Sequence, residues 1–117
     1  MRNFELSEFD SPDEQGSGKY MDEGFLSMLD DARGIAGIPF IINSGFRTPS
    51  HNAYVGGKEK SSHQYGYAVD LHCTGSRERS IIISSLQEAG FTRFGIGNTF
   101  IHTDSDPDKD SNVIWTY

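Results

Sequence analysis

Apolar residues recur along the chain with two different spacings, and each spacing predicts its own kind of element. Between residues 19 and 36 they return every three or four positions, which predicts an amphipathic helix that ends at Gly37. The same spacing predicts a second helix over residues 77–89, with Ser76 as its N-cap and Gly90 just past its end.

Short apolar runs bounded by Gly, Pro or Ser predict the strands. Residues 38–45 (IPFIINSG) and 66–74 (GYAVDLHCT) have the length and the bounding residues of strands. Two or three further strands are expected within residues 91–104 and 112–117, around an Asp-rich loop. Residues 46–57 predict a loop with one helical turn. This order of elements predicts an α+β fold, a small antiparallel sheet packed against two helices.

Length and composition are those of one small domain. The chain has 117 residues, of which 35% are hydrophobic, and no repeat or linker divides it. We therefore expect a single domain over residues 1–117 with one modest core. Residues 1–18 follow neither apolar spacing and predict an irregular lead-in that ends in the turn QGSG.

The net charge and the cysteine content limit the classes of partner and the kinds of metal ligand that this chain can have. The formal net charge is −7 and no cluster of Lys and Arg offsets it, which argues against a nucleic-acid partner. Cys73 is the only cysteine, so an intrachain disulfide and cysteine-rich zinc sites are excluded. A metal site in this chain would have to use His, Asp and Glu side chains.

The first residues predict neither an export signal nor a membrane anchor. The segment MRNFELSEFDSPDEQGSG contains acids and no apolar run. We therefore expect a soluble monomer, made in the cytoplasm and without a membrane partner, which would need another route of release to work outside the cell.

Two polar residues interrupt predicted apolar strands, and a histidine stands close to the first of these strands. Asp70 lies inside an apolar strand, where an unpaired carboxylate would cost several kcal/mol. His102 interrupts a second strand, and His63 lies among Ser, Gln and Tyr just before the first. Two histidines and one carboxylate can hold zinc and leave a fourth position open. The alternative is structural: Asp70 caps a turn and hydrogen bonds satisfy the histidines.

The spacing of these residues resembles a family signature. The pattern SxHxxGxAxD over residues 61–70 is similar to that of the zinc D-Ala-D-Ala carboxypeptidase family, which includes D,D-dipeptidases, phage endolysins and hedgehog-like proteins. Upstream, residues 44–48 (SGFRT) resemble its Ser-x-x-Arg segment, and residues 100–104 (FIHTD) resemble its closing strand. The resemblance implies a hedgehog-like D,D-peptidase fold and one Zn²⁺ per chain, bound by His63, Asp70 and His102.

The resemblance also gives roles to two residues that would not bind the metal. Arg47 would bind the carboxylate of a peptide C-terminus, a task that suits a planar guanidinium. The alternative is an ordinary loop arginine. Ser61 would hydrogen-bond ligand or substrate, or else cap the loop.

At the position where the family usually has its general base, this chain differs from the family pattern. Many relatives have an acidic residue three positions before the last zinc histidine, and Thr99 stands there in this chain. Asp104, two residues after His102 and on the same strand face, is the nearest carboxylate. We expect it to serve as the catalytic base or to orient a ligand, with His72 as the other candidate for a supporting role.

These inferences predict a zinc peptidase that hydrolyses peptidoglycan stem peptides near a D-amino acid, as a carboxypeptidase or an endopeptidase. By resemblance, the small size fits an endolysin or a phage entry enzyme, or a cell-wall enzyme released indirectly. A zinc-containing module that binds cell-wall peptides without cutting them is the alternative, and a structural protein without a metal is a third.

Overall fold

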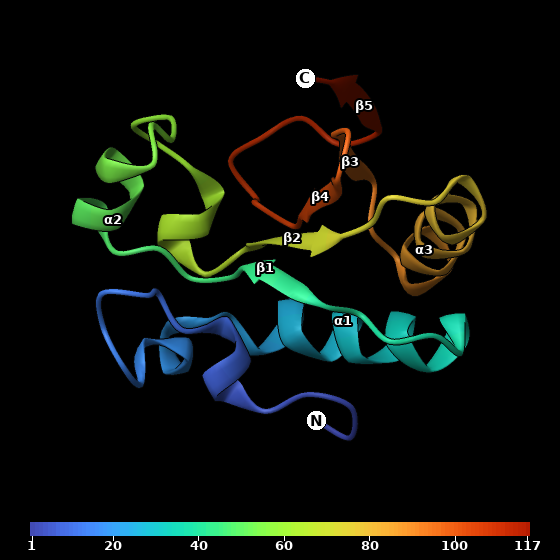
Figure 1. Cartoon of the computed structure of the whole chain (residues 1–117), viewed down its shortest axis with the longest axis horizontal. Helices are drawn as coiled ribbons and strands as arrows, with labels where there is room; N and C mark the ends of the chain where they lie inside the picture. Colours follow the sequence, from blue (N-terminus) through green and yellow to red (C-terminus); the bar gives the residue numbers. More distant parts are fainter.

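The sheet has five strands and is not purely antiparallel. A computed structural model describes all residues from Met1 to Tyr117. Its strands are β1 (Ile42–Ser44), β2 (Ala68–His72), β3 (Arg93–Ile96), β4 (Phe100–Asp104) and β5 (Val113–Thr116). They lie in the order β1-β2-β4-β3-β5 (Figure 1).

Strands β3 and β5 are parallel, and all other neighbouring strands are antiparallel. The prediction of a wholly antiparallel sheet was therefore wrong at its last strand. Strand β2 occupies one edge of β4 and β3 occupies the other. The chain that leaves β4 adds to the free edge of β3. Since β5 runs opposite to β4, it must then run parallel to β3.

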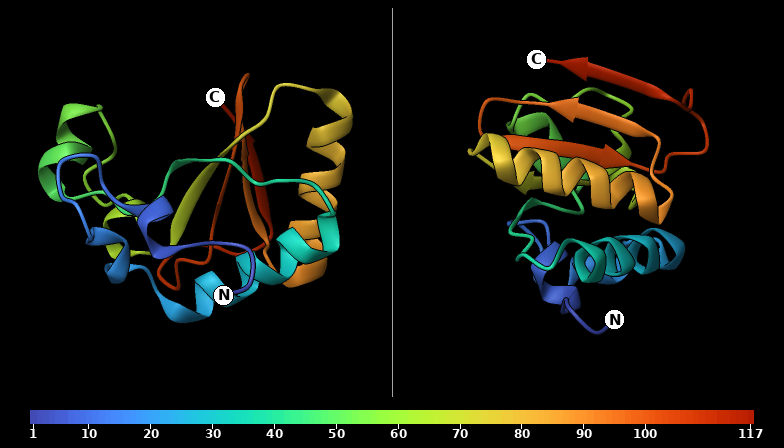
Figure 2. Two further views of the ribbon diagram at one scale, coloured as in Figure 1. Left: turned by 60° about the horizontal axis from the view of Figure 1, so that its bottom comes forward. Right: turned by 90° about the vertical axis from the view of Figure 1, so that its right-hand side faces the viewer.

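Two long helices cover one face of this sheet. Helices α1 (Glu23–Ala36) and α3 (Ser76–Ala89) lie side by side there (Figure 2). Both bury apolar side chains against the sheet, so the α+β class and the two long helices are as predicted. Fully buried core residues include Phe25, Leu29, Val69, Leu71, Leu86 and Ile101. None of the helices combines the length and the apolar composition that a membrane span requires.

Helix α1 begins later than the apolar spacing predicts. The predicted start at residue 19 lies in a separate 3-10 helix, η2 (Ser17–Tyr20). Asp22 is the N-cap of α1, and its carboxylate accepts a hydrogen bond from the amide of Phe25. The cap therefore separates two helical segments, η2 and α1, where the apolar spacing predicts a single helix. Helix α3 starts at Ser76 itself, and Gly75 is the N-cap.

The lead-in over residues 1–18 is packed against the domain. It contains a second 3-10 helix, η1 (Leu6–Phe9), and it buries Phe9 completely. The carbonyl of Phe9 accepts a hydrogen bond from the amide of Phe46, which ties the lead-in to the segment after β1. The prediction of an irregular lead-in missed these contacts because two isolated phenylalanines give no periodicity.

Two short helices lie at one end of the sheet and carry or border the polar residues of interest. Helix α2 (Pro49–Tyr54) follows its N-cap Thr48, and the 3-10 helix η3 (Ser62–Tyr65) carries His63. Gly66 ends η3 with a φ of 78°. A Cβ at Gly66 would collide with the carbonyl oxygen of Tyr20. The glycine therefore permits the turn that leads from η3 directly into β2.

Candidate metal centre

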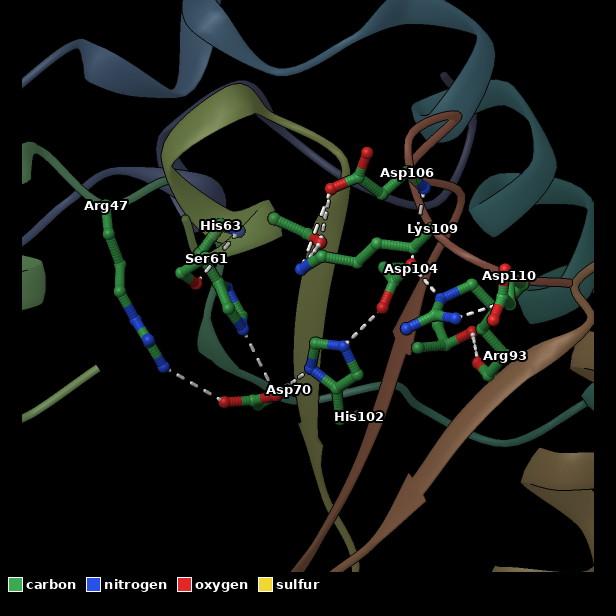
Figure 3. A network of polar contacts seen from close by, with 12 residues as sticks. Arg47, Ser61, His63, Asp70, Arg93, His102, Asp104, Asp106, Lys109 and Asp110 are labelled. Carbon is green, nitrogen blue, oxygen red and sulfur yellow. Dashed lines mark hydrogen bonds and ion pairs between the residues drawn. The ribbon is translucent and has the colours of Figure 1, made fainter. Parts of the chain in front are cut away.

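The three predicted ligands lie together on the sheet face opposite the long helices. Val69 and Leu71 of β2 point into the core, so Asp70 between them points to the other face. Asp70 pairs directly with His102 of the adjacent strand β4, and η3 brings His63 to the same place (Figure 3). One ligand atom from each of the three residues lies within 4.8 Å of the others.

A backbone carbonyl fixes the orientation of His63. Its Nδ1 lies 2.8 Å from the carbonyl oxygen of Gly45. A carbonyl only accepts hydrogen bonds, so Nδ1 carries the proton and Nε2 of the neutral ring has the lone pair. That Nε2 lies 3.4 Å from Oδ1 of Asp70. Burial lowers the pKa of His63, so the neutral ring with an available Nε2 is favoured.

His102 lies between two carboxylates. Its Nε2 is 2.7 Å from Oδ2 of Asp104, and its Nδ1 is 2.9 Å from Oδ1 of Asp70. Burial acts to lower the pKa of His102, but hydrogen bonds with Asp104 and Asp70 outweigh it, and the pKa is raised. In the neutral ring, the shorter contact with the more buried Asp104 keeps the proton on Nε2. The lone pair of Nδ1 then faces Asp70.

Asp70 is ionised at any ordinary pH. Burial acts to raise the pKa of its carboxyl, but the contacts with His102 and His63 outweigh burial and hold the pKa well below its usual range. Oδ1 faces both histidines, and Oδ2 lies 3.4 Å from Nη2 of Arg47.

The converging atoms need a cation. When both histidines are neutral, Nε2 of His63, Nδ1 of His102 and Oδ1 of Asp70 face one another as three acceptors without a donor. Either an additional proton on His102 or a metal ion satisfies them. The separations of 2.9 and 3.4 Å from Asp70 lie close to the edge of a zinc coordination tetrahedron, about 3.3 Å. The donor set therefore fits a metal ion with His and carboxylate ligands.

Arg47 lies at the edge of this cluster, and its predicted role in binding a substrate carboxylate stays a prediction. Its Nε contacts Ser44 Oγ at 3.1 Å, Nη1 contacts Asn52 Oδ1 at 3.2 Å, and Nη2 contacts Asp70. Each terminal nitrogen keeps a second N–H group without a partner. The guanidinium is thus held in place by three contacts and still has donors for a further anion.

Ser61 caps a helix, which is one of the two roles that the sequence analysis gave for it. It is the N-cap of η3, and its hydroxyl accepts a hydrogen bond from the amide of His63 at 3.3 Å. Ser61 also lines the pocket in front of the cluster, so its second predicted role, a contact with substrate, stays a prediction.

Asp104 has both carboxylate oxygens occupied. Oδ2 accepts from His102, and Oδ1 lies 2.7 Å from Nε of Arg93. The side chain is 1% exposed. This geometry favours the orienting role for Asp104, while its predicted role as catalytic base stays a prediction. His72 is exposed at the end of β2 and does not line the pocket.

Several residues that border the cluster could not be recognised from the sequence. Trp115 of β5 lies against the ring of His102, with ring centroids 5.6 Å apart, and Arg93 lies over the indole. Tyr117, directly after the end of β5, lines the pocket as well. Trp115 is the only tryptophan of the chain, but its sequence position does not reveal which strand β5 joins.

The cluster opens into a pocket of about 750 Å³, large enough for a few peptide residues. Asp70 and Asp104 are its only carboxylate residues, so no further acid lies ready as a base. Its remaining lining is polar or basic, with a few apolar residues from β4 and β5 and from the end of α2.

Comparisons with known proteins agree with this geometry. Over 54 residues the chain is 39% identical to a zinc D-Ala-D-Ala carboxypeptidase of Streptomyces albus G, an alignment that covers 46% of this chain. It covers 21% of that relative, so the chain spans about a fifth of the relative's length. A family model described as Peptidase M15 matches residues 3–104. Because this match extends from the lead-in through the strand that carries His102 and Asp104, the chain belongs to the peptidase M15 family.

Proposed function

We propose that the protein is a zinc peptidase that hydrolyses peptidoglycan stem peptides next to a D-amino acid. The observation that carries the proposal is the convergence of His63, Asp70 and His102, with tautomers that leave three acceptors facing one point. The name of the relative from Streptomyces albus G supports the choice of zinc and of a D-Ala-D-Ala peptide.

In this proposal each residue has a defined task. His63, Asp70 and His102 would hold the zinc ion, which when bound supplies a Lewis acid that polarises the substrate carbonyl and lowers the pKa of water. Gly45 and Asp104 hold the outer nitrogens of the two histidines, so that the inner nitrogens remain unprotonated.

Arg47 would bind the C-terminal carboxylate of the substrate through its free N–H groups. Ser44 and Asn52 fix the plane of the guanidinium, so little side-chain entropy is lost when the carboxylate binds. A carboxypeptidase needs such a group beside the cleaved bond. An endopeptidase would use the same donors on a substrate carbonyl.

One observation favours a second candidate, a zinc module that binds cell-wall peptides without cutting them. Both oxygens of Asp104 already have partners, and no other carboxylate besides Asp70 lines the pocket. A peptidase needs a group that takes a proton from water and passes it to the leaving amine. The test must therefore separate zinc binding, peptide binding and cleavage.

The decisive experiment measures zinc content and cleavage in the same preparations. We expect one zinc per chain, and cleavage of purified cell walls or of peptides ending in D-Ala-D-Ala, detected by mass spectrometry. His63→Ala should lose zinc and cleavage. His72→Ala, which changes an exposed histidine of β2, is the matched control and should keep both. Zinc and peptide binding without cleavage would identify the binding module, and absence of zinc from the wild type would contradict both candidates.

A further inference from the structure

The pocket has a charge opposite to that of the chain. The whole chain has 17 acidic and 10 basic residues. Half of the basic residues nevertheless line this one pocket, against two carboxylates, Asp70 and Asp104. The basic residues of the lining are Arg47, Lys58, Lys60, Arg93 and Lys109. A ligand with more negative charge than one C-terminal carboxylate would match such a pocket.

Three of these five cations already have partners. Arg47 contacts Asp70, Arg93 contacts Asp104, and Lys109 donates to Ser62 Oγ at 2.7 Å beside Asp106. Lys58 and Lys60 form no ion pair and no side-chain hydrogen bond, and both are exposed. Two ammonium groups at the pocket are therefore free to meet an anion.

The loop that carries these lysines is fixed against Arg47. Asn52 is buried, and its side chain accepts from Arg47 and donates to the carbonyl of Lys58 at 2.8 Å. The same carbonyl accepts from the amide of Ser61 at 3.1 Å. At Gly57 the backbone passes so close that a Cβ would lie 3.0 Å from Nη1 of Arg47.

This loop thus places free positive charge next to the guanidinium that would hold the substrate's C-terminus. Glu59, between the two lysines, does not line the pocket. Its charge is therefore not directed at the same ligand.

We propose that Lys58 and Lys60 form an anion subsite that selects peptides with a further carboxylate close to the cleaved bond. The inference rests on the proposed function and names its substrate class, an acidic peptide. Because both ammonium groups are exposed, the interaction is modest and is screened by salt. We expect the two lysines together to give about a three- to tenfold preference at low ionic strength.

The test uses peptides that end in D-Ala-D-Ala and differ only in Glu or Gln at one of the residues that precede this dipeptide, one position at a time. Wild-type protein should show a higher kcat/KM for the Glu peptide at one position at least, and 0.5 M salt should reduce this preference. In the double variant Lys58→Gln/Lys60→Gln the Glu-to-Gln ratio should fall to about one. The matched control Lys19→Gln, outside the pocket and beside Tyr20, should keep the wild-type ratio.

Equal kcat/KM for Glu and Gln at every position, or an unchanged ratio in the double variant, would overturn the subsite. If no peptide is cleaved, the proposed activity fails separately, and calorimetric dissociation constants for the same peptide pairs decide the subsite. Tighter binding of the Glu peptide that depends on Lys58 and Lys60 would support it, and equal binding of both peptides would overturn it.

Discussion

His102 connects the candidate metal centre to a second ion pair. Its inner nitrogen faces Asp70, and its outer nitrogen faces Asp104, which in turn contacts Arg93. A carboxylate that accepts from the outer nitrogen keeps the inner nitrogen unprotonated and makes it a stronger ligand. The geometry thus makes zinc binding by His102 depend on Asp104, a residue that would not contact the metal itself.

The variant Asp104→Asn distinguishes the two roles of Asp104. If Asp104 orients His102, the variant should weaken zinc binding by about 10- to 100-fold, measured by competition with a chelator of known affinity. If Asp104 is the base, zinc affinity should persist and turnover should fall by roughly two to four orders of magnitude. From the geometry we expect the first result. Asp108→Asn, on the exposed loop after β4, is the control and should change neither.

The variant Arg47→Lys tests the carboxylate-binding role. Lysine keeps the charge but cannot contact Ser44, Asn52 and a substrate carboxylate at once. We expect zinc content to be unchanged and kcat/KM to fall about tenfold or more on peptides with a free C-terminal carboxylate. The same peptides with a C-terminal amide should be affected much less. An equal loss on both peptide types would show that Arg47 acts on the fold or on Asp70 instead.

At the scale of the elements, one row of residues crosses the whole sheet at the metal centre. Ser44, Asp70, His102, Gly95 and Trp115 are successive partners on β1, β2, β4, β3 and β5. The missing side chain at Gly95 lets the indole of Trp115 reach across β3 to the ring of His102. Strand β5 therefore contributes Trp115 to the centre, and this contact requires a glycine at position 95 of β3.

Gly95→Ala tests this arrangement. The new Cβ would lie 2.6 Å from Nε1 of Trp115 and 2.8 Å from the hydroxyl of Tyr117, so both side chains must move. We expect a shift in the fluorescence of this single tryptophan and a loss of stability of about 1–3 kcal/mol. Denaturant unfolding and emission spectra measure both. Gly34→Ala, on α1 with nothing within 4 Å of the added Cβ, should leave the emission unchanged.

The sequence could predict most of the elements and the three residues that form the cluster, but not the partners across strands. Asp70 and His102 are recognisable because each interrupts an apolar strand, and alternation along β2 and β4 places their side chains on one face. His63, on η3, is recognisable by its polar neighbours just before the first of these strands. Arg93 and Trp115 depend on how β3 and β5 align with β4, which no local spacing encodes. The late start of α1 has a local cause, the Asp22 cap, yet the apolar spacing continues through it.

For the whole molecule, the net charge of the chain does not indicate the sign of the charge around the pocket. A net charge of −7 describes the surface on average, but folding gathers half of the basic residues around one cavity. Sequence order separates Arg47 from Arg93 and Lys109, so no cluster of cations is visible along the chain. The fold places the α2–η3 region next to strand β4 and the loop after it, and this arrangement gathers the charges around the pocket.

The metal should stabilise the whole fold, and the effect should grow with pH. Burial lowers the pKa of His63, so that residue is neutral already, whereas the contacts of His102 with Asp104 and Asp70 overcome burial and raise its pKa. The proton on His102 stabilises the metal-free fold below about pH 6.5, and this contribution is lost as the pH rises through the raised pKa. Zinc must displace that same proton, so its apparent affinity increases over the same interval.

Thermal unfolding with zinc and with chelator, at pH 6 and pH 8, measures this coupling. Free zinc at a hundredfold excess over its dissociation constant adds about 2.7 kcal/mol to the stability of the fold. For a domain of this size the midpoint should rise by roughly 10 °C. At one fixed free zinc concentration we expect a larger rise at pH 8 than at pH 6. His63→Ala should show no rise at either pH. A wild-type shift of equal size at both pH values would mean that zinc displaces no proton from His102, and would contradict the additional proton on this residue in the metal-free protein.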